Sequence, residues 1–154
     1  LLNTGRAHIA HAMVNKGYVA SVDEAFKKYL SKGMSCYVPR KTYSPKESIE
    51  MIKNAGGLAI LAHPVYITED YGKLYSLLKQ LKEYGLDGTE CLYNCYSEEF
   101  SKMCFDICDK LGLVKSGGSD FHGGNKPDVE LGKVSGGYVP YEFLLNMKEQ
   151  RGLM

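Results

Sequence analysis

Hydrophobic and polar positions alternate along this chain in two patterns, which predict helices and strands in turn. Apolar residues at helical spacing predict helices over about 4–16, 21–33, 44–55, 73–84, 97–111 and 140–150. A short apolar run predicts a strand at 58–62, and the strand-like segments 88–93 and 111–118 are two further candidates. Because strands and helices follow one another, the order favours an α/β fold with a parallel sheet joined by right-handed crossovers.

The first part of the chain differs from the rest, because its pattern contains helices and no strand. An extended link, "SCYVPRKTY" at 35–43, follows these helices. "SPKE" at Ser44–Glu47 then combines a capping box with a proline in the first helical turn, which marks a new beginning. We therefore expect a helical lobe over residues 1–40 and the α/β part over residues 41–154.

Composition and charge fit one domain of ordinary character. The chain has 154 residues, of which 44% are hydrophobic, and its 19 basic and 18 acidic residues are interspersed and give a net charge of +1. This balance argues against a non-specific nucleic-acid or membrane binder. No apolar run approaches the length of a membrane span, so we expect a cytoplasmic protein without a membrane partner.

Polar residues follow two of the predicted strands directly. His63 comes after the run "LAILA", while Asp120 and His122 come after the strand at 111–118. Carboxyl ends of parallel strands meet at one edge of a sheet, so these side chains are candidates for a shared cation. Carboxylate with imidazole suits Zn, Mn or Fe(II) better than calcium. The alternatives are a satisfied polar histidine and an Asx-type turn.

Other polar residues are less specific. Arg6 and His8 lie near the start of the first predicted helix, where a guanidinium and free N–H groups can bind a phosphate, or where both side chains are simply solvated. Glu90 is either a further acid at the strand ends or a cap of the next turn. Lys126 is either an anion contact or ordinary surface.

Four of the five cysteines form two pairs with the same spacing, Cys91 with Cys95 and Cys104 with Cys108. Such pairs can bind zinc, but structural zinc sites usually place their cysteines on tight turns. Cys104 and Cys108 lie on the apolar stripe of a predicted helix. We therefore interpret them as small core residues.

The motifs "GRAHIA", "YVP", "LAILAHP", "GLDGTE" and "GGSDFHG" followed by "LG", in this order, resemble the polymerase and histidinol phosphatase (PHP) superfamily. The chain looks most like the branch that acts on nucleotides and nucleic-acid 5′ ends. The resemblance implies a distorted β/α barrel with a cluster of divalent metals, Mn, Zn or Fe, that activates water to hydrolyse phosphate monoesters. It implies metal ligands at His63, Asp120 and His122, and substrate phosphate contacts at Arg6 and His8.

The sequence also departs from that family. The early His-x-His motif and its neighbouring ligands have no counterpart, and position 7 is alanine where proline is expected. We therefore expect the C-terminal portion of such a domain: a partial barrel with an incomplete metal cluster, inactive alone. An open sheet edge would favour self-association.

Two other functions are open. The chain can be a non-catalytic, degenerate PHP module that binds a nucleotide, an anion or a protein partner. It can also be an unrelated doubly wound nucleotide-binding domain, but no GxGxxG motif follows a strand and opens a helix.

Overall fold

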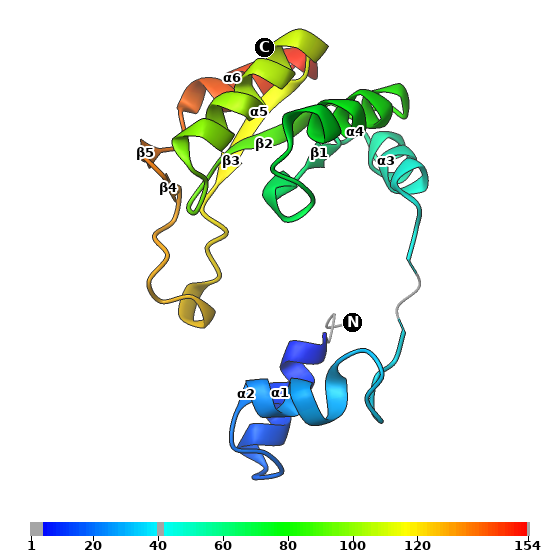
Figure 1. The fold of residues 1–154 in the computed structure, drawn as a ribbon, viewed down its shortest axis with the longest axis vertical. Helices are drawn as coiled ribbons and strands as arrows, with labels where there is room; N and C mark the ends of the chain where they lie inside the picture. Colours follow the sequence, from blue (N-terminus) through cyan, green and yellow to red (C-terminus); the bar gives the residue numbers. More distant parts are fainter. Residues whose placement is uncertain (1–4, 40–41, 154) are drawn as a thin grey trace. The chain divides into compact units, whose positions relative to one another are not determined.

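The computed structural model describes residues 5–39 and 42–153. Contacts within the chain divide it into two compact units, Leu1–Thr42 and Tyr43–Met154. Each unit is described by itself, and Figure 1 shows the elements of both.

The first unit is helical and has a small core of its own. It contains three helical elements: α1 (Arg6–Asn15), α2 (Val22–Ala25) and the π-helical turn η1 (Phe26–Leu30). They pack around four buried residues, Ala10, Val19, Ala25 and Leu30. Ser21 caps α2 by accepting a hydrogen bond from the Glu24 N–H, as its sequence predicts.

The predicted length of the second helix is wrong. Helical structure ends at Leu30 rather than at Gly33, because the chain turns back there and the Cys36 N–H donates to the Tyr29 carbonyl. Thr4, the expected start of the first helix, lies outside the described residues.

The second unit is built on a parallel sheet with the strand order β1-β2-β3. Its strands are β1 (Ile60–Leu61), β2 (Gly88–Tyr93) and β3 (Val114–Gly118). Its helices are α3 (Pro45–Asn54), α4 (Tyr71–Glu83), α5 (Glu98–Leu111) and α6 (Tyr141–Gln150). The α/β class and the parallel sheet are confirmed.

The connecting segments hold smaller elements. These are two 3-10 turns, η2 (Pro64–Tyr66) and η3 (Gly123–Asn125), and an antiparallel pair, β4 (Lys133–Val134) with β5 (Gly137–Tyr138). The sequence pattern did not predict the β4–β5 hairpin. Its strands have two residues each, which is too short for an alternating pattern.

Local sequence explains where the helices begin and end. Ser44 and Glu47 form the predicted capping box of α3, with the Glu47 N–H donating to Ser44 Oγ and the Ser44 N–H donating to Glu47 Oε2. Ser97 caps α5 by accepting a hydrogen bond from the Phe100 N–H, and Gly112 ends this helix in the left-handed region.

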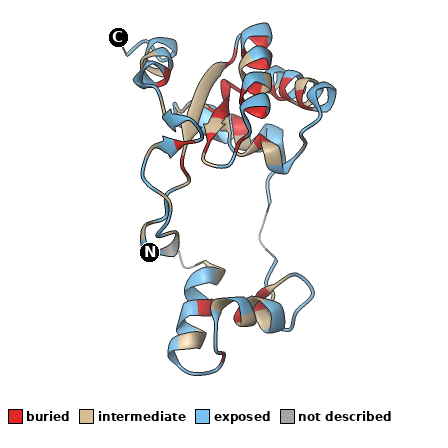
Figure 2. Cartoon of the chain, turned by 60° about the vertical axis from the view of Figure 1, so that its left-hand side comes forward, coloured by how far each residue is buried: buried red, intermediate tan, exposed pale blue. Residues whose placement is uncertain are grey.

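The core lies between the sheet and the helices that pack on it. Figure 2 shows the buried residues on the strands and on the helix faces turned toward them. The fully buried side chains include Leu74 and Leu78 of α4 and Ile107 of α5. Cys104 and Cys108 are also buried, which confirms their interpretation as core residues.

Gly88 brings two strands unusually close together. A Cβ at this position would lie 2.3 Å from the Val114 carbonyl oxygen, far inside van der Waals contact. Only glycine therefore fits where β2 begins beside β3.

The first predicted strand is shorter and less covered than expected. Residues 58–62 were expected to form a strand buried on both faces, but β1 covers only Ile60–Leu61, both half-buried, and Ala62 is exposed. The physical reason is its position, because among the described residues β1 pairs with β2 alone. No helix in the described part of the chain is long and apolar enough to cross a membrane.

Candidate functional site

Three polar side chains converge beyond the ends of β1 and β3. His63 Nε2 lies 4.0 Å from Asp120 Oδ1, and His122 Nδ1 lies 3.4 Å from the same oxygen. The structure thus brings His63 together with Asp120 and His122, which follow it by 57 and 59 positions in the sequence. The Oδ1 atom of Asp120 faces both imidazoles.

The backbone at two of these residues is strained. His63 has φ 51° and Asp120 has φ 54°, and they are the two non-glycine residues with positive φ in the described chain. A side chain in this region costs on the order of 1 kcal/mol and is typical of functional sites. Glycine would avoid this cost at both positions. The presence of histidine and aspartate instead indicates that their side chains have a function there.

Glu90 in β2 holds the backbone of His63 through a hydrogen bond. Its carboxylate is buried, and Oε2 accepts hydrogen bonds from the His63 backbone N–H at 2.9 Å and from the Tyr96 hydroxyl at 3.3 Å. His63 Nδ1 also lies 2.9 Å from Oε2. The approach is not aligned for a hydrogen bond, so this buried nitrogen has no hydrogen-bond partner.

Two other residues hold Asp120. The Tyr93 hydroxyl donates to Oδ2 at 3.1 Å, and the Lys126 ammonium forms an ion pair with the same oxygen. The hydrogen bond from Lys126 lowers the pKa of the Asp120 carboxyl, against the opposite effect of burial. Burial is the main cause that raises the pKa of Tyr93, which keeps its hydroxyl protonated as a donor. With Oδ2 occupied, Oδ1 remains for the two imidazoles.

The donor atoms are of the kinds that bind a transition metal, but their positions do not yet surround an ion. His122 Nδ1 lies 2.7 Å from the Asp120 carbonyl oxygen, and a proton shared there leaves Nε2 with a lone pair. Two imidazoles and a carboxylate suit Zn, Mn or Fe(II). Within residues 5–39 and 42–153, however, no three His, Cys, Asp or Glu side chains are grouped closely enough to hold an ion.

Arg6 and His8 belong to the other unit and have partners there. The Arg6 Nη1 donates to the Leu30 carbonyl at 3.2 Å, and its guanidinium carbon lies 5.4 Å from the centre of the Tyr37 ring. His8 Nδ1 accepts from the Gly5 N–H at the start of α1. Their role as phosphate contacts stays a prediction.

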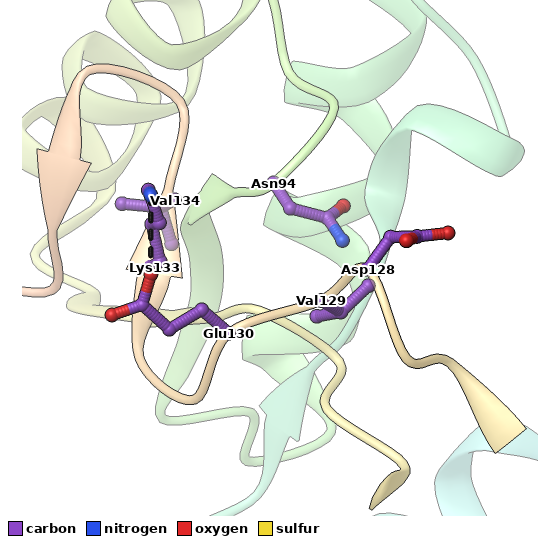
Figure 3. A pocket seen from close by; sticks show the side chains of 6 residues that line it. All are labelled: Asn94, Asp128, Val129, Glu130, Lys133 and Val134. Atoms are coloured by element: carbon purple, nitrogen blue, oxygen red, sulfur yellow. Dashed lines mark hydrogen bonds and ion pairs between the residues drawn. The ribbon is translucent and has the colours of Figure 1, made fainter. Parts of the chain in front are cut away.

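A polar pocket of about 190 Å³ lies next to the segment that carries Asp120. Its lining residues are Asn94, Asp128, Val129, Glu130, Lys133 and Val134 (Figure 3). The Asn94 amide donates to the Ser119 carbonyl, which ties the pocket to this segment. Glu130 is already engaged by Lys133 and Tyr138, and the carboxylate of Asp128 points away from Glu130 (Figure 3).

Sequence reasoning left part of this site undecided or unnamed. The sequence allowed two interpretations each for Glu90 and Lys126. In the structure both contact a predicted ligand, Glu90 contacting His63 and Lys126 contacting Asp120. Tyr93 and Tyr96 were not singled out. Their only signal was a position at the end of β2, the strand between the two that carry the ligands.

Comparison with known proteins gives relatives of one chemical kind. No protein-family model matches the chain. A 5′-3′ exoribonuclease of Haemophilus influenzae is 34% identical over 117 residues, which is 76% of this chain and 43% of the relative. A 3′,5′-nucleoside bisphosphate phosphatase of Chromobacterium violaceum is 30% identical over 128 residues, which is 82% of this chain and 45% of the relative.

A solved structure agrees with these relatives. A Bifidobacterium adolescentis protein described as a metal-dependent phosphoesterase superposes with a TM-score of 0.69 at 27% identity, covering 95% of this chain and 50% of that one. The chain spans less than half the length of the curated relatives it matches. In sequence and in fold, the chain is therefore similar to phosphoesterases and exoribonucleases over about half of their length.

Proposed function

We propose that the full gene product is a metal-dependent phosphoesterase that hydrolyses phosphate monoesters of nucleotides or of nucleic-acid 5′ ends. Within it, this chain supplies His63, Asp120 and His122 as metal ligands and forms part of a β/α barrel. The observation that carries the proposal is the position of Asp120 Oδ1, which faces imidazoles from two separate strand ends. The names of the relatives support the substrate class.

The residues of the chain have separate tasks in this proposal. A bound divalent metal supplies a Lewis acid that activates water and neutralises phosphate charge. His63 and His122 would supply imidazole nitrogens as ligands, while Tyr93 and Lys126 hold Asp120 so that Oδ1 faces them. Arg6 and His8 contact the substrate phosphate. The near-neutral net charge of the chain favours a few terminal nucleotides over a long nucleic-acid tract.

The test uses the full gene product purified with manganese. Phosphate release is measured from a 5′-phosphorylated oligoribonucleotide and from a nucleoside 3′,5′-bisphosphate. His63→Ala and Asp120→Ala are each expected to lower the rate more than about a hundredfold, because each removes a ligand. His11→Ala and Asp128→Asn, both at exposed positions, are the matched controls and should retain the rate.

Failure of this test has a clear form. If the full gene product releases no phosphate with Mn, Zn or Fe, or if the ligand variants keep the rate of their controls, the proposal is wrong. Elemental analysis of the purified protein identifies the metal.

A second candidate function follows from the ion pair between Lys126 and Asp120. A module in which this lysine neutralises the carboxylate permanently would bind a nucleotide or another anion without metal and without catalysis. Nucleotide binding that persists in the presence of a chelator, with no phosphate release with any metal, would favour it.

Self-association through the outer edge of β1 is a separate prediction, which sedimentation at two concentrations tests.

A further inference from the structure

Three polar groups approach a single oxygen of Glu90. Oε2 accepts from the His63 backbone N–H at 2.9 Å and from the Tyr96 hydroxyl at 3.3 Å, and His63 Nδ1 lies 2.9 Å away. A carboxylate oxygen carries lone pairs that serve several donors at once. Glu90 therefore contacts both the backbone and the ring of His63.

The environment of Glu90 makes this contact strong. The Glu90 residue is 6% exposed, and no lysine or arginine in the described parts of the chain pairs with its carboxylate. Burial is the first cause that raises the pKa of Tyr96, so this tyrosine remains a protonated donor. The contacts of the Glu90 carboxylate are thus hydrogen-bond donors rather than a cation, and in a low-dielectric site each donor counts more than it would in water.

The ring of His63 has one nitrogen that is buried without a hydrogen bond, and this is the nitrogen beside Glu90. An ionised carboxylate only accepts hydrogen bonds, so a proton on Nδ1 is favourable and a lone pair there is not. Nδ1 already lies within hydrogen-bond distance of Oε2, and the χ2 torsion of histidine has a broad minimum that permits a better alignment. The other nitrogen, Nε2, then keeps its lone pair on the side of Asp120.

We propose that Glu90 is a positioning residue that fixes the proton of His63 on Nδ1 and thereby presents Nε2 as a metal ligand. The proposal rests on the proposed function, because it gives the second nitrogen a metal to bind. Carboxylates that hold the far nitrogen of a ligating histidine orient the ring and raise its basicity in many metal sites.

A purely structural role for Glu90 is the competing explanation. In that case the carboxylate would only satisfy the backbone N–H of His63, whose φ is 51°. Glu90→Gln separates the two, because the amide keeps an oxygen acceptor for the N–H and loses the charge that selects the tautomer. Glu99→Gln, at an exposed position of α5, is the matched control.

The first measurement reads the tautomer directly, without metal. Nitrogen NMR spectra of the full gene product labelled in its histidines are recorded in a chelator at about pH 8.5, where imidazoles are ordinarily neutral. His63→Ala assigns the signals. We expect His63 to carry its proton on Nδ1 in the unmodified protein and in Glu99→Gln, and to lose this preference in Glu90→Gln. A proton on Nε2 in the unmodified protein, or unchanged signals in Glu90→Gln, overturns the proposal.

The second measurement is the affinity for Mn²⁺ by calorimetry. Glu90→Gln should bind about ten- to a hundredfold more weakly than the unmodified protein and Glu99→Gln. Equal affinity of all three overturns this inference and leaves the proposed function standing. An unmodified protein that binds none of Mn²⁺, Zn²⁺ and Fe²⁺, but shows the Nδ1 proton, overturns the proposed function instead. If Glu90→Gln does not fold, Glu90→Asp withdraws the carboxylate from the ring and must show the same two losses.

Discussion

Asp87 and Glu90 are two buried carboxylates, three residues apart in the sequence, that meet their neighbours in different ways. Asp87 is 7% exposed and Glu90 is 6% exposed. Asp87 Oδ2 accepts from the Ala59 N–H at 2.7 Å, and Oδ1 accepts from Lys53 Nζ at 2.7 Å and from the Gln150 amide at 3.3 Å. Glu90 instead lies beside a buried nitrogen of His63 that has no hydrogen bond.

This difference separates a carboxylate that serves the fold from one that serves the site. Asp87 comes directly before β2, and its partners lie in α3, in the segment that enters β1 and in α6. Its bonds therefore tie four segments together where the strands begin. Glu90 lies inside β2, one residue past the level at which β1 ends, and the nearby His63 Nδ1 is still without a hydrogen bond. Burial alone does not distinguish the two, whereas the state of the partners does.

The largest effect on stability is expected from Asp87→Ala. The substitution leaves the Ala59 N–H, bonded in a buried setting, without its acceptor, and it releases Lys53 and Gln150. We expect a loss of about 2–3 kcal/mol in the free energy of unfolding, since hydrogen bonds to charged groups contribute about 1.5–3 kcal/mol each and these three compensate partly through water. Urea unfolding followed by circular dichroism measures it.

The control for this prediction is Asp109→Ala. Asp109 also pairs with a lysine, Lys115, but its side chain is 66% exposed. Exposed pairs contribute at most about 1 kcal/mol. If the two variants lost the same stability, the idea that Asp87 serves the fold would fail.

A smaller change is expected from Glu90→Gln. The amide retains an acceptor for the His63 N–H, and it removes a buried charge whose desolvation is unfavourable. These effects oppose one another, so the free energy of unfolding should change by less than about 1 kcal/mol in the metal-free protein. The same urea experiment, with Glu99→Gln as control, checks it. A loss as large as that of Asp87→Ala would make Glu90 a second structural carboxylate and remove the contrast.

Much of the α/β unit followed from local sequence. β2 was predicted with the bounds it has, Gly88–Tyr93, because a short strand-like segment between two helical patterns is a local signal. The start of α5 at Ser97 was equally local. The β4–β5 hairpin was missed because its two-residue strands are defined by pairing rather than by pattern.

In the site, too, residues with a local signal could be predicted and residues defined by distant contacts could not. His63, Asp120 and His122 could be proposed because each follows a strand, and parallel strands end at one edge. The function of Glu90 was not readable, since an acid inside a strand is compatible with a cap, a ligand or a partner of histidine. Only the non-local approach of His63, 27 residues earlier, decides among them. The contact of Lys126 with Asp120 likewise depends on the path of the turn between them.

The smallest effect is expected from Lys53→Met, which tests what makes Asp87 important. The Lys53 side chain is 42% exposed, so its ammonium is already hydrated and gains little from the pair. Asp87 would keep the Ala59 N–H and the Gln150 amide as donors. We therefore expect a loss of about 0.5 kcal/mol or less, decreasing with added salt, when urea unfolding is compared with the exposed α4 variant Lys79→Met. A loss equal to that of Asp87→Ala would mean that the ion pair, rather than the hydrogen bond to the strand entrance, ties these segments together. The Asp87 carboxylate would then act mainly through its lysine partner, as Asp120 does, rather than through the backbone N–H of Ala59.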